Sequence, residues 1–426
     1  MKIFGEAENG AIEQANNCLK EAIDFVLMAD NHKGYGMPVG GVAVYKDKIS
    51  PAGVGFDIAC GNKAVKLDVK LQDIQLDLPA IADKIFSKLE FGVGRSNNEK
   101  IDSPLFKSKT WDIIDTFAYR FKDKAYSQLG TIGSGNHYVD VFVDENGYIW
   151  VGVHFGSRGL GHTIASHFMK LAGDNTNIMD ETPHTLDVNS AEGQNYIDCM
   201  NLAGEYAYAG REWVCNKVAE IIGADIIEEV HNHHNFAWKE THNGEYYWVV
   251  RKGATPAFPG QKGFVGGSME DNAVIIEGVD SALSKEAYYS TVHGAGRIMS
   301  RTQAAGKKRF KKLFKCGNRD CEGELNNRTL AKGEPNPKCP ICGGKTHKWK
   351  GWVQTAKGEV DFSAVQDRLR ADNIILKGAG ADEAPEVYKF LPDVLAEHDG
   401  TIRILHTLRP LIVCMAGSDE FDPYKD

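Results

Sequence analysis

Five short segments, four of them rich in glycine and spread between residues 53 and 301, carry most of the side chains in this chain that could do chemistry. The four place a histidine, a cysteine or an aspartate on backbone that small residues allow to bend sharply or to approach a ligand closely. If these side chains act together, loops far apart in the 426-residue sequence must meet in one place. A chain of this length can form two ordinary domains, or one large domain with insertions. The segments read GVGFDIACG (53–61), GSGNHY (133–138), VHFGSRGLGH (153–162), HNHHNFAW (231–238) and STVHGAGRIMSR (290–301).

The first three segments offer side chains of the kinds that hold transition-metal ions. Asp57 and Cys60 flank a tight turn, and His137 and His154 each stand among glycines. Thiolate, carboxylate and neutral imidazole together suit ions such as manganese, zinc or iron. A thiolate at Cys60 could bridge two ions, which would then stabilise both oxygens of a phosphoryl displacement. A buried cysteine beside a capping aspartate is the simpler alternative.

The last segment and a basic loop before it indicate phosphate handling. His293 stands beside glycines, and a guanidinium such as that of Arg297 binds phosphate in a bidentate manner. The loop RKGATPA at 251–257, followed by further glycines and Ser268, matches neither a P-loop nor a dinucleotide fingerprint. Its backbone N–H groups and Arg251 could still hold a nucleotide. The alternative for His293 is a glycine turn with a surface histidine.

A polar segment around residue 330 has the pattern of a zinc ribbon. The spacing C-x4-C-x17-C-x2-C suits a tetrahedral structural zinc in a segment too short to build a core. A basic run, KKRFKKLFK at 307–315, precedes it. Because the whole chain has a formal net charge of −9, nucleic acid would have to meet a local patch such as this run. A protein partner for the ribbon, and an amphipathic helix with a solvated basic face, are the alternatives. The cysteines are Cys316, Cys321, Cys339 and Cys342.

Helix and strand patterns alternate irregularly, which favours an α+β fold with mixed sheets over a doubly wound repeat. If the metal-ligand side chains act together, they would line a central metal cleft in this fold. The patterns predict a helix that starts near residue 11 and runs into a loop or strand by residue 30. The other predicted helices span about 78–91, 108–128, 160–173 and 190–222, and the predicted strands span about 138–155, 224–230, 246–251 and 273–278.

The predicted organisation has four parts, and no part is a membrane span. Residues 1–305 and 351–417 form the body, 306–350 hold the basic segment and the ribbon, and 418–426 form an acidic tail. No apolar run approaches the roughly 20 residues that cross a bilayer. The start of the chain lacks the apolar stretch of a signal peptide, so we expect a cytoplasmic protein with no membrane partner.

The ordered motifs resemble those of the RtcB family of RNA-splicing ligases. The set comprises GVGFDIACG, GTIGSGNHYVD, VHFGSRGLGH, HHNFAW, RKGATPA with GGSM, STVHGAGRIMSR and DEAPEVYK. Upstream, the segment at 28–36, which reads MADNHKGYG, is similar to the family's Met-Pro-Asp-x-His glycine segment. The similarity runs from about residue 28 to 417 and is interrupted by the ribbon, which is not part of the usual pattern.

The resemblance implies an RNA ligase that uses GTP and two manganese ions. His293 would attack the α-phosphate of GTP, leaving a histidine-linked GMP that passes to a 3′-phosphate RNA end, which the family can generate from a 2′,3′-cyclic phosphate. A 5′-hydroxyl end would then attack and expel GMP, in RNA repair or tRNA splicing, with DNA as a possible substrate and an archease-type activator as a possible partner. The implied manganese ligands are Asp57, Cys60 (bridging), His137, His154 and His234. The implied phosphate and nucleotide contacts are Asn136, Asp140, Arg158, Arg251, Ser268, Gly294, Ala295, Gly296 and Arg297.

The sequence departs from the family pattern where the base should be bound. Ala416 stands where the family commonly has a lysine, Asp140 replaces a glutamate, and MEDNA at 269–273 replaces a small, Ser/Thr-containing stretch. ATP or another nucleotide therefore stays open. Three other functions remain as alternatives: a two-metal phosphoesterase or nuclease on the same ligands, a nucleic-acid-binding ribbon protein with an idle body, and a ligase for DNA or damaged RNA.

Overall fold

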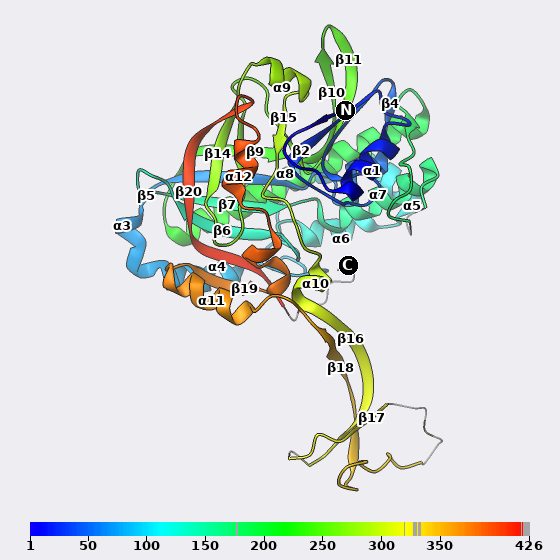
Figure 1. Ribbon diagram of the computed structural model, residues 1–426, viewed down its shortest axis with the longest axis vertical. Helices are drawn as coiled ribbons and strands as arrows, with labels where there is room; N and C mark the ends of the chain where they lie inside the picture. Colours follow the sequence, from blue (N-terminus) through cyan, green and yellow to red (C-terminus); the bar gives the residue numbers. More distant parts are fainter. Residues whose placement is uncertain (176–177, 319, 327–329, 331–333, 419, 421–426) are drawn as a thin grey trace.

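The structure, a computed structural model, describes residues 1–175, 178–318, 320–326, 330, 334–418 and 420. Most of them form one body, from which a narrow arm projects (Figure 1). The body mixes sheets and helices, which confirms the predicted α+β class. The predicted acidic tail at 418–426 falls almost entirely outside the described residues. None of the described helices has the length and apolar character needed to cross a membrane.

The largest sheet has eight strands in the order β13-β14-β20-β6-β7-β5-β9, with β19 paired to β20. Every pair is antiparallel except β19 with β20. The strands are β5 (Gly61–Lys70), β6 (Tyr138–Val143), β7 (Tyr148–Phe155), β9 (Ile226–His233), β13 (Lys262–Val265), β14 (Ala273–Gly278), β19 (Ile375–Ala379) and β20 (Ile402–Gly417).

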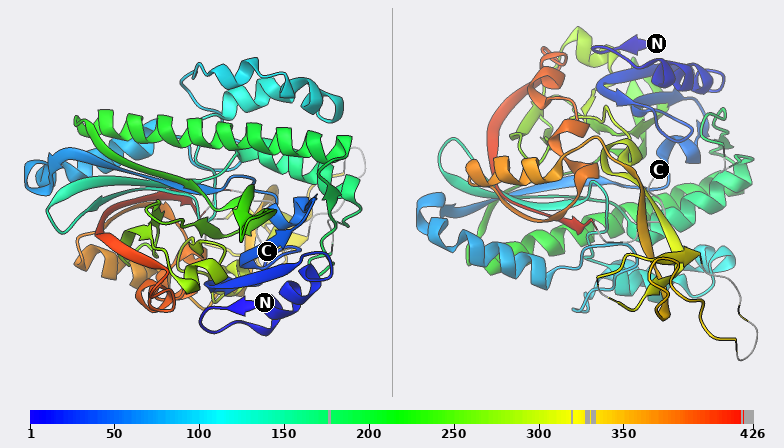
Figure 2. Two further views of the ribbon diagram at one scale, coloured as in Figure 1. Left: turned by 90° about the horizontal axis from the view of Figure 1, so that it is seen from above. Right: turned by 60° about the horizontal axis from the view of Figure 1, so that its bottom comes forward.

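A long helix, α8 (Ala191–Ile222), lies across one face of this sheet (Figure 2, left). The side chain of Ser190 caps its start by accepting the N–H of Gly193, and Gly223 ends it in a left-handed conformation. Helix α4 (Leu78–Lys88) packs beside it against β19 and β20. β6 and β7 are rich in β-branched and aromatic residues and almost wholly buried, because both of their faces are covered. This burial makes the ends of these strands rigid supports for the loops that follow.

A second sheet of five strands has the order β1-β2-β3-β11-β10 and carries the N-terminal segment. Its strands are β1 (Lys2–Ile3), β2 (Asp24–His32), β3 (Val39–Tyr45), β10 (Asn235–His242) and β11 (Glu245–Lys252). The short pairs are β4 (Lys48–Ile49) with β8 (Leu186–Asp187), and β12 (Ala254–Pro256) with β15 (Ser290–Val292).

The remaining elements are short, apart from α7. They are α1 (Asn9–Cys18), α2 (Pro51–Val54), α3 (Leu71–Ile74), η1 (Gln75–Asp77), η2 (Pro104–Lys107), α5 (Thr110–Phe117), α6 (Phe121–Gln128), α7 (Arg158–Ala172), α9 (Ala282–Glu286), α10 (Arg301–Ala305), α11 (Phe362–Ala371), η3 (Ala381–Glu383), η4 (Pro385–Val387) and α12 (Leu391–Ala396).

Several predicted elements are confirmed with shifted ends. Helices near 78–91, 160–173 and 190–222 are α4, α7 and α8, and the predicted strands correspond to β6 with β7, β9, β11 and β14. The helix predicted over 108–128 is two helices, α5 and α6, and Arg120 between them adopts a left-handed φ of 56°. The helix predicted from residue 11 ends at Cys18, and β2 follows, as the shortening of the apolar pattern indicated.

The arm is a twisted antiparallel ribbon of β16 (Gly306–Cys316) and β18 (Thr346–Lys357), with β17 (Glu324–Asn326) added near its tip. The basic run at 307–315 is therefore a strand and not an amphipathic helix. The returning strand continues to Lys357, beyond the end predicted for the inserted part at residue 350. The arm leaves the body after α10 and re-enters it before α11 (Figure 1).

Candidate active site

The chain presents its metal-ligand side chains at the ends of four neighbouring strands, β6, β7, β5 and β9. Cys60 directly precedes β5 and His137 directly precedes β6, while His154 is the last but one residue of β7 and His234 directly follows β9. The antiparallel register sets the start of β5 beside the ends of β7 and β9, and the start of β6 beside the end of β7. Strand pairing therefore brings loops between residue 57 and residue 234 together at one end of these four strands.

The donor atoms at this edge form two groups that share one sulfur. Asp57, Cys60 and His137 make one group, and Cys60, His154 and His234 make the other; within each, the donor atoms lie within 4.8 Å of one another. Cys60 Sγ is 3.1 Å from His154 Nε2 and 3.6 Å from His137 Nε2. His137 Nε2 is 3.1 Å from Asp57 Oδ2. This donor set fits two transition-metal ions that share a thiolate.

Burial sets the charge state of these ligands. It lowers the pKa of His154 and of His234 well below the ordinary value, which leaves neutral imidazoles with a lone pair for a metal ion. Burial, together with the charge of Asp57, raises the pKa of the Cys60 thiol well above its ordinary value. Burial alone would also raise the pKa of Asp57, but the hydrogen bond and charge of His137 bring it down to about 2. A metal ion must therefore displace a proton from Cys60.

Two residues behind the cluster support the turn from Asp57 to Cys60. A Cβ atom at Gly156 would lie 2.1 Å from Asp57 Oδ1, so only glycine leaves room for this carboxylate. The guanidinium of Arg211, on α8, is fully buried, and its Nη1 donates to the carbonyl oxygens of Ala59 at 3.0 Å and Phe155 at 2.5 Å. Its positive charge opposes part of the rise that burial causes in the pKa of Cys60, which favours the thiolate that a metal ion needs.

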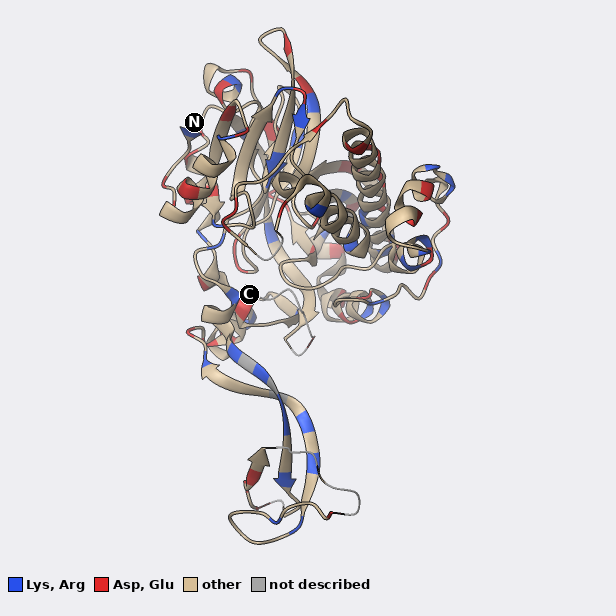
Figure 3. Ribbon diagram, turned by 90° about the vertical axis from the view of Figure 1, so that its right-hand side faces the viewer, with Lys and Arg blue, Asp and Glu red and all other residues tan. Residues whose placement is uncertain are grey.

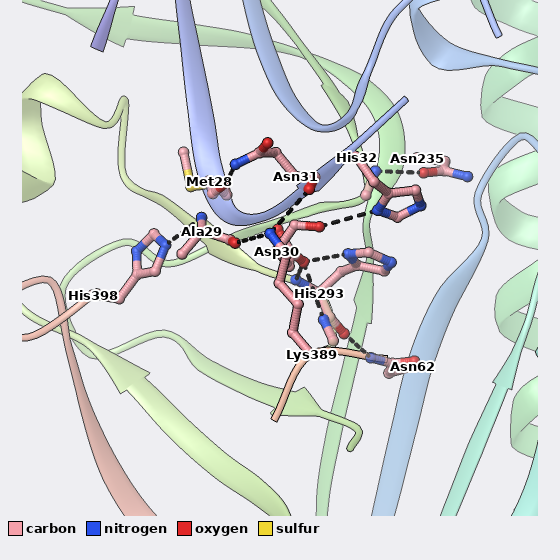
Figure 4. Close-up of polar contacts among 12 residues, drawn as sticks. Met28, Ala29, Asp30, Asn31, His32, Asn62, Asn235, His293, Lys389 and His398 are labelled. Atoms are coloured by element: carbon pink, nitrogen blue, oxygen red, sulfur yellow. Dashed lines mark hydrogen bonds and ion pairs between the residues drawn. The ribbon is translucent and has the colours of Figure 1, made fainter. Parts of the chain in front are cut away.

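His293 is held at one ring nitrogen by a buried carboxylate (Figure 4). Its Nδ1 lies 2.6 Å from Asp30 Oδ2, and the backbone N–H groups of His293 and Gly294 donate to the same oxygen at 3.0 Å and 3.4 Å. Burial would raise the pKa of Asp30, but the charge of His293 and these hydrogen bonds give a net lowering. An ionised carboxylate only accepts, so Nδ1 carries a proton, and in the neutral form of the ring the lone pair is on Nε2.

The backbone around Asp30 is itself fixed. The register between β2 and β3 shifts between Leu27 and His32, which frees this end of β2 from regular pairing. Lys389 Nζ then donates to the carbonyl oxygens of Ala29 at 2.8 Å and Asn31 at 3.1 Å. Lys389 therefore fixes the backbone on both sides of Asp30, the residue whose carboxylate orients His293.

A cavity of about 420 Å³ is lined by His293 and by four of the five predicted metal ligands, Asp57, Cys60, His154 and His234. The rings of His234 and His293 lie 4.8 Å apart, centre to centre, in an edge-on arrangement. A larger hollow of about 640 Å³ between α4 and α11 is lined by no histidine, cysteine, aspartate or glutamate among its described residues. The cavity of about 420 Å³ is the candidate active site because it brings the predicted nucleophile and the predicted metal ligands together.

Most of the other predicted site residues line this cavity. Its lining includes Asn136, Asp140, Ser268, Gly294, Ala295, Gly296 and Arg297. Arg297 donates from Nη2 to the carbonyl oxygen of Asp382 at 2.8 Å, and its Nη1 lies 3.3 Å from Glu383 Oε2. The DEAPEVYK segment thus fixes the direction of Arg297. Burial raises the pKa of the Asp140 carboxyl well above its ordinary value.

Two predicted arginines do not line the cavity. Arg251 is fully buried, pairs through Nη1 and Nη2 with Glu240 at 2.5 Å and 3.1 Å, and donates from Nε to Ser290 Oγ at 2.8 Å. Arg158 lies behind the first ligand group, where its Nη1 is 3.2 Å from His137 Nδ1. Lys252, next to Arg251, lines the cavity, and burial lowers its pKa to about 8.

Sequence reasoning assigned no role to Asp30 or Arg211. The signal for Asp30 was a carboxylate inside the apolar strand DFVLMADNH, where a buried charge needs a partner. In the sequence, Arg211 is an ordinary residue of a long predicted helix. The packing of α8 against β5 and β7 places it behind the predicted metal ligands.

The four cysteines of the arm form a separate cluster at its tip. Their Sγ atoms lie within 4.8 Å of one another, with Cys316 3.5 Å from Cys342 and Cys321 3.6 Å from Cys339. The backbone N–H groups of Cys342 and Ile341 lower the pKa of the Cys339 thiol to about 6. Four cysteine sulfurs this close together fit a structural zinc ion, which four thiolates bind.

Comparison with known proteins gives one consistent result. A family model described as tRNA-splicing ligase RtcB matches residues 14–120 and 114–320. The RNA-splicing ligase RtcB of Escherichia coli is 29% identical over 448 residues, which cover 96% of this chain and 95% of that protein. The tRNA-splicing ligase RtcB of Methanococcus maripaludis is 31% identical over 383 residues, covering 71% of this chain and 79% of that protein. The matches confirm the resemblance seen in the motifs.

Proposed function

Because the chain belongs to the RtcB family of RNA-splicing ligases, we propose that it joins RNA ends through a covalent histidine–nucleotide intermediate. The observation that carries this proposal is His293 itself. Its Nδ1 is bound by Asp30, its ring lies beside the metal-ligand candidate His234, and it lines the cavity. A phosphoesterase on the same ligands would need the metal ions but no oriented imidazole.

In the first step, Nε2 of His293 attacks the α-phosphorus of GTP. A P–N bond forms, the bond from the α-phosphorus to the bridging oxygen of the β-phosphate breaks, and pyrophosphate leaves. Asp30 stabilises the positive charge that develops on the ring, because its ionised carboxylate accepts a hydrogen bond from Nδ1–H. Two manganese ions held by Asp57, Cys60, His137, His154 and His234 would supply Lewis-acid charge to the phosphates.

In the next steps the nucleotide acts as a leaving group for RNA. An oxygen of a 3′-phosphate end attacks the GMP phosphorus, the P–N bond breaks, and His293 is regenerated. The 5′-hydroxyl end then attacks the capped 3′-phosphate, loses its proton, and expels GMP. A 2′,3′-cyclic phosphate end would first be opened by water to the 3′-phosphate. The cap is needed because an uncapped phosphate monoester has no good leaving group.

The cavity offers further groups for phosphate binding. We assign this role to Asn136, Arg297 and the backbone of 294–296, which line the cavity. A phosphate contact by Arg158, which lies beside His137 and does not line the cavity, stays a prediction from the resemblance. The nucleotide base remains the open part of the proposal, because Ala416 and the segment after Ser268 depart from the family pattern. An archease-type activator and a cytoplasmic location stay predictions from the resemblance and the composition.

A labelling experiment tests the function. The protein is incubated with manganese and each of the α-phosphate-labelled nucleoside triphosphates in turn, and acid-labile labelling of the protein is measured. RNAs with 3′-phosphate and 5′-hydroxyl ends are then added and joining is followed on a gel. We expect labelling by GTP and joining that consumes the label. Hydrolysis of RNA without labelling by any nucleotide would replace the ligase with a phosphoesterase.

Asp30→Asn is expected to slow labelling on the order of 10⁴-fold while leaving the nucleotide concentration for half-maximal rate nearly unchanged. An amide can donate to Nδ1, which moves the ring proton to Nε2 and removes the nucleophilic lone pair. Single-turnover labelling over a range of nucleotide concentrations separates the two quantities. A variant that changes only the half-maximal concentration would give Asp30 a binding role instead.

Cys339→Ser is expected to remove the zinc from the arm without affecting the labelling of His293. The serine hydroxyl is a poor replacement for a thiolate ligand, and the tip of the arm has little core of its own. Metal analysis of the purified protein should fall from one zinc per chain to none. Full zinc content in the variant, or a matching loss of labelling, would contradict a purely structural ion.

A further inference from the structure

The two strands of the arm carry a high density of positive charge in a chain that is acidic as a whole. β16 has six lysines and arginines among its eleven residues, and β18 has three among twelve, whereas neither strand contains an aspartate or a glutamate. The whole chain has a net charge of −9. Figure 3 shows the basic residues distributed along the arm from its base toward its tip. Charge of one sign is therefore concentrated on one element.

Some of these charges oppose each other directly. The strand register pairs Lys312 with Lys350, and both side chains are exposed. Like charges opposite each other destabilise a strand pair. Within the described part of the chain, no carboxylate pairs with Lys307, Arg309, Lys312 or Lys350. A ribbon that only carried a zinc site would gain nothing from this arrangement, whereas a bound polyanion would neutralise it.

The base of the arm belongs to the wall of the cavity. Arg301, the first residue of α10, lines the cavity, and its Nη1 lies 2.7 Å from Glu383 Oε1. β16 begins five residues later, at Gly306. On the return, the N–H groups of Glu359 and Val360 donate to the carbonyl oxygens of α10. A strand of nucleic acid whose end lies in the cavity can therefore continue onto the arm.

We propose that the arm binds the RNA strand whose end occupies the cavity. This inference rests on the proposed function and adds where the substrate runs outside the site. At roughly 3.3 Å per residue, the eleven residues of β16 extend about 36 Å from the body. Rows of lysine and arginine bind phosphates along such a length, whereas the cores of protein interfaces are depleted in lysine. RNA is thus favoured over a protein partner.

The test uses the full-length protein and a quadruple variant in which Lys307, Arg309, Lys312 and Lys350 are each changed to Gln. Two fluorescein-labelled RNAs with 3′-phosphate ends are titrated without nucleotide: one just long enough to fill the cavity and one several times longer. We expect the variant to bind the long RNA about tenfold or more weakly at moderate salt, and the short RNA as the wild type does. The slope of log affinity against log salt for the long RNA should fall by up to about 3, at about 0.7 per lost phosphate contact.

The matched control changes four exposed lysines of the body, Lys84, Lys88, Lys122 and Lys170, to Gln. It removes the same net charge, so an effect of overall charge alone would appear in both variants. Equal weakening in both, or unchanged binding of the long RNA by the arm variant, would overturn the inference. Unchanged binding of the long RNA would favour a protein, and not RNA, as the partner of the arm.

Two further readouts keep this test separate from the proposed function. Zinc content and circular dichroism confirm that the arm variant is folded. Labelling of His293 by GTP, measured without RNA, should be unchanged in the arm variant. If the wild type takes up no label, the proposed function fails, while the comparison of RNA binding still decides the role of the arm.

Discussion

His293→Ala abolishes nucleotide labelling of the protein and RNA joining, while its fold and metal content stay intact. The imidazole is the only group that we assign to the P–N bond, and no other described histidine that lines the cavity has an Nδ1 held by a carboxylate. The measurement is uptake of the labelled α-phosphate, followed by mass spectrometry of the labelled peptide in the wild type. The label should be acid-labile and should fall on the peptide that contains His293.

The control for this prediction is His406→Ala. His406 lies on β20 outside the cavity, where its Nδ1 is 2.7 Å from Glu145 Oε1, so it resembles His293 in its partner but not in its position. This variant should be labelled at the wild-type rate. Persistent acid-labile labelling of His293→Ala would remove His293 from the mechanism.

Cys60→Ala should lose both manganese ions, whereas variants of ligands in only one group should lose one. Cys60 Sγ is the atom common to the two donor groups, while His137 belongs to the first and His154 to the second. Equilibrium dialysis should give two ions per chain for the wild type, about one for His137→Ala or His154→Ala, and none for Cys60→Ala at the same free manganese concentration. Mutating a residue that hydrogen-bonds to a metal ligand typically lowers metal affinity 10- to 100-fold. Removing a ligand itself is expected to lower the affinity of its site by more than this.

Cys199→Ala serves as the control for loss of a buried thiol. Cys199 is fully buried on α8 and belongs to neither ligand group. It should keep two ions. One ion retained in Cys60→Ala would show that the sulfur does not bridge.

The sequence predicted which loops form the site better than it predicted which individual side chains reach the cavity. Glycine frames around Cys60, His137 and His154 indicated loops that end buried strands, and the register of β6, β7, β5 and β9 brings those ends together. Which arginines reach the cavity could not be predicted. Arg251 and Lys252 are neighbours on a strand, so their side chains point to opposite faces of the sheet. Arg251 forms an ion pair with Glu240 on the adjacent strand and does not reach the cavity.

Residues that act through another residue were the hardest to find. Asp30 lies more than 260 positions from His293 in sequence, and its role follows from the irregular pairing at the end of β2. The arm shows the same limit at the level of secondary structure. Six basic residues interleaved with apolar ones fit a helix or a strand, and the choice between them came from pairing with β18, which lies beyond the cysteines.

The most direct test of the central claim is a crystal structure of the manganese-loaded protein with anomalous scattering measured near the manganese edge. The arrangement of Asp57, Cys60, His137, His154 and His234 predicts two anomalous peaks, both within bonding distance of Cys60 Sγ and both opening onto the cavity that His293 lines. A single peak, or a second peak away from Cys60, would contradict a thiolate-bridged pair of ions beside the nucleophile.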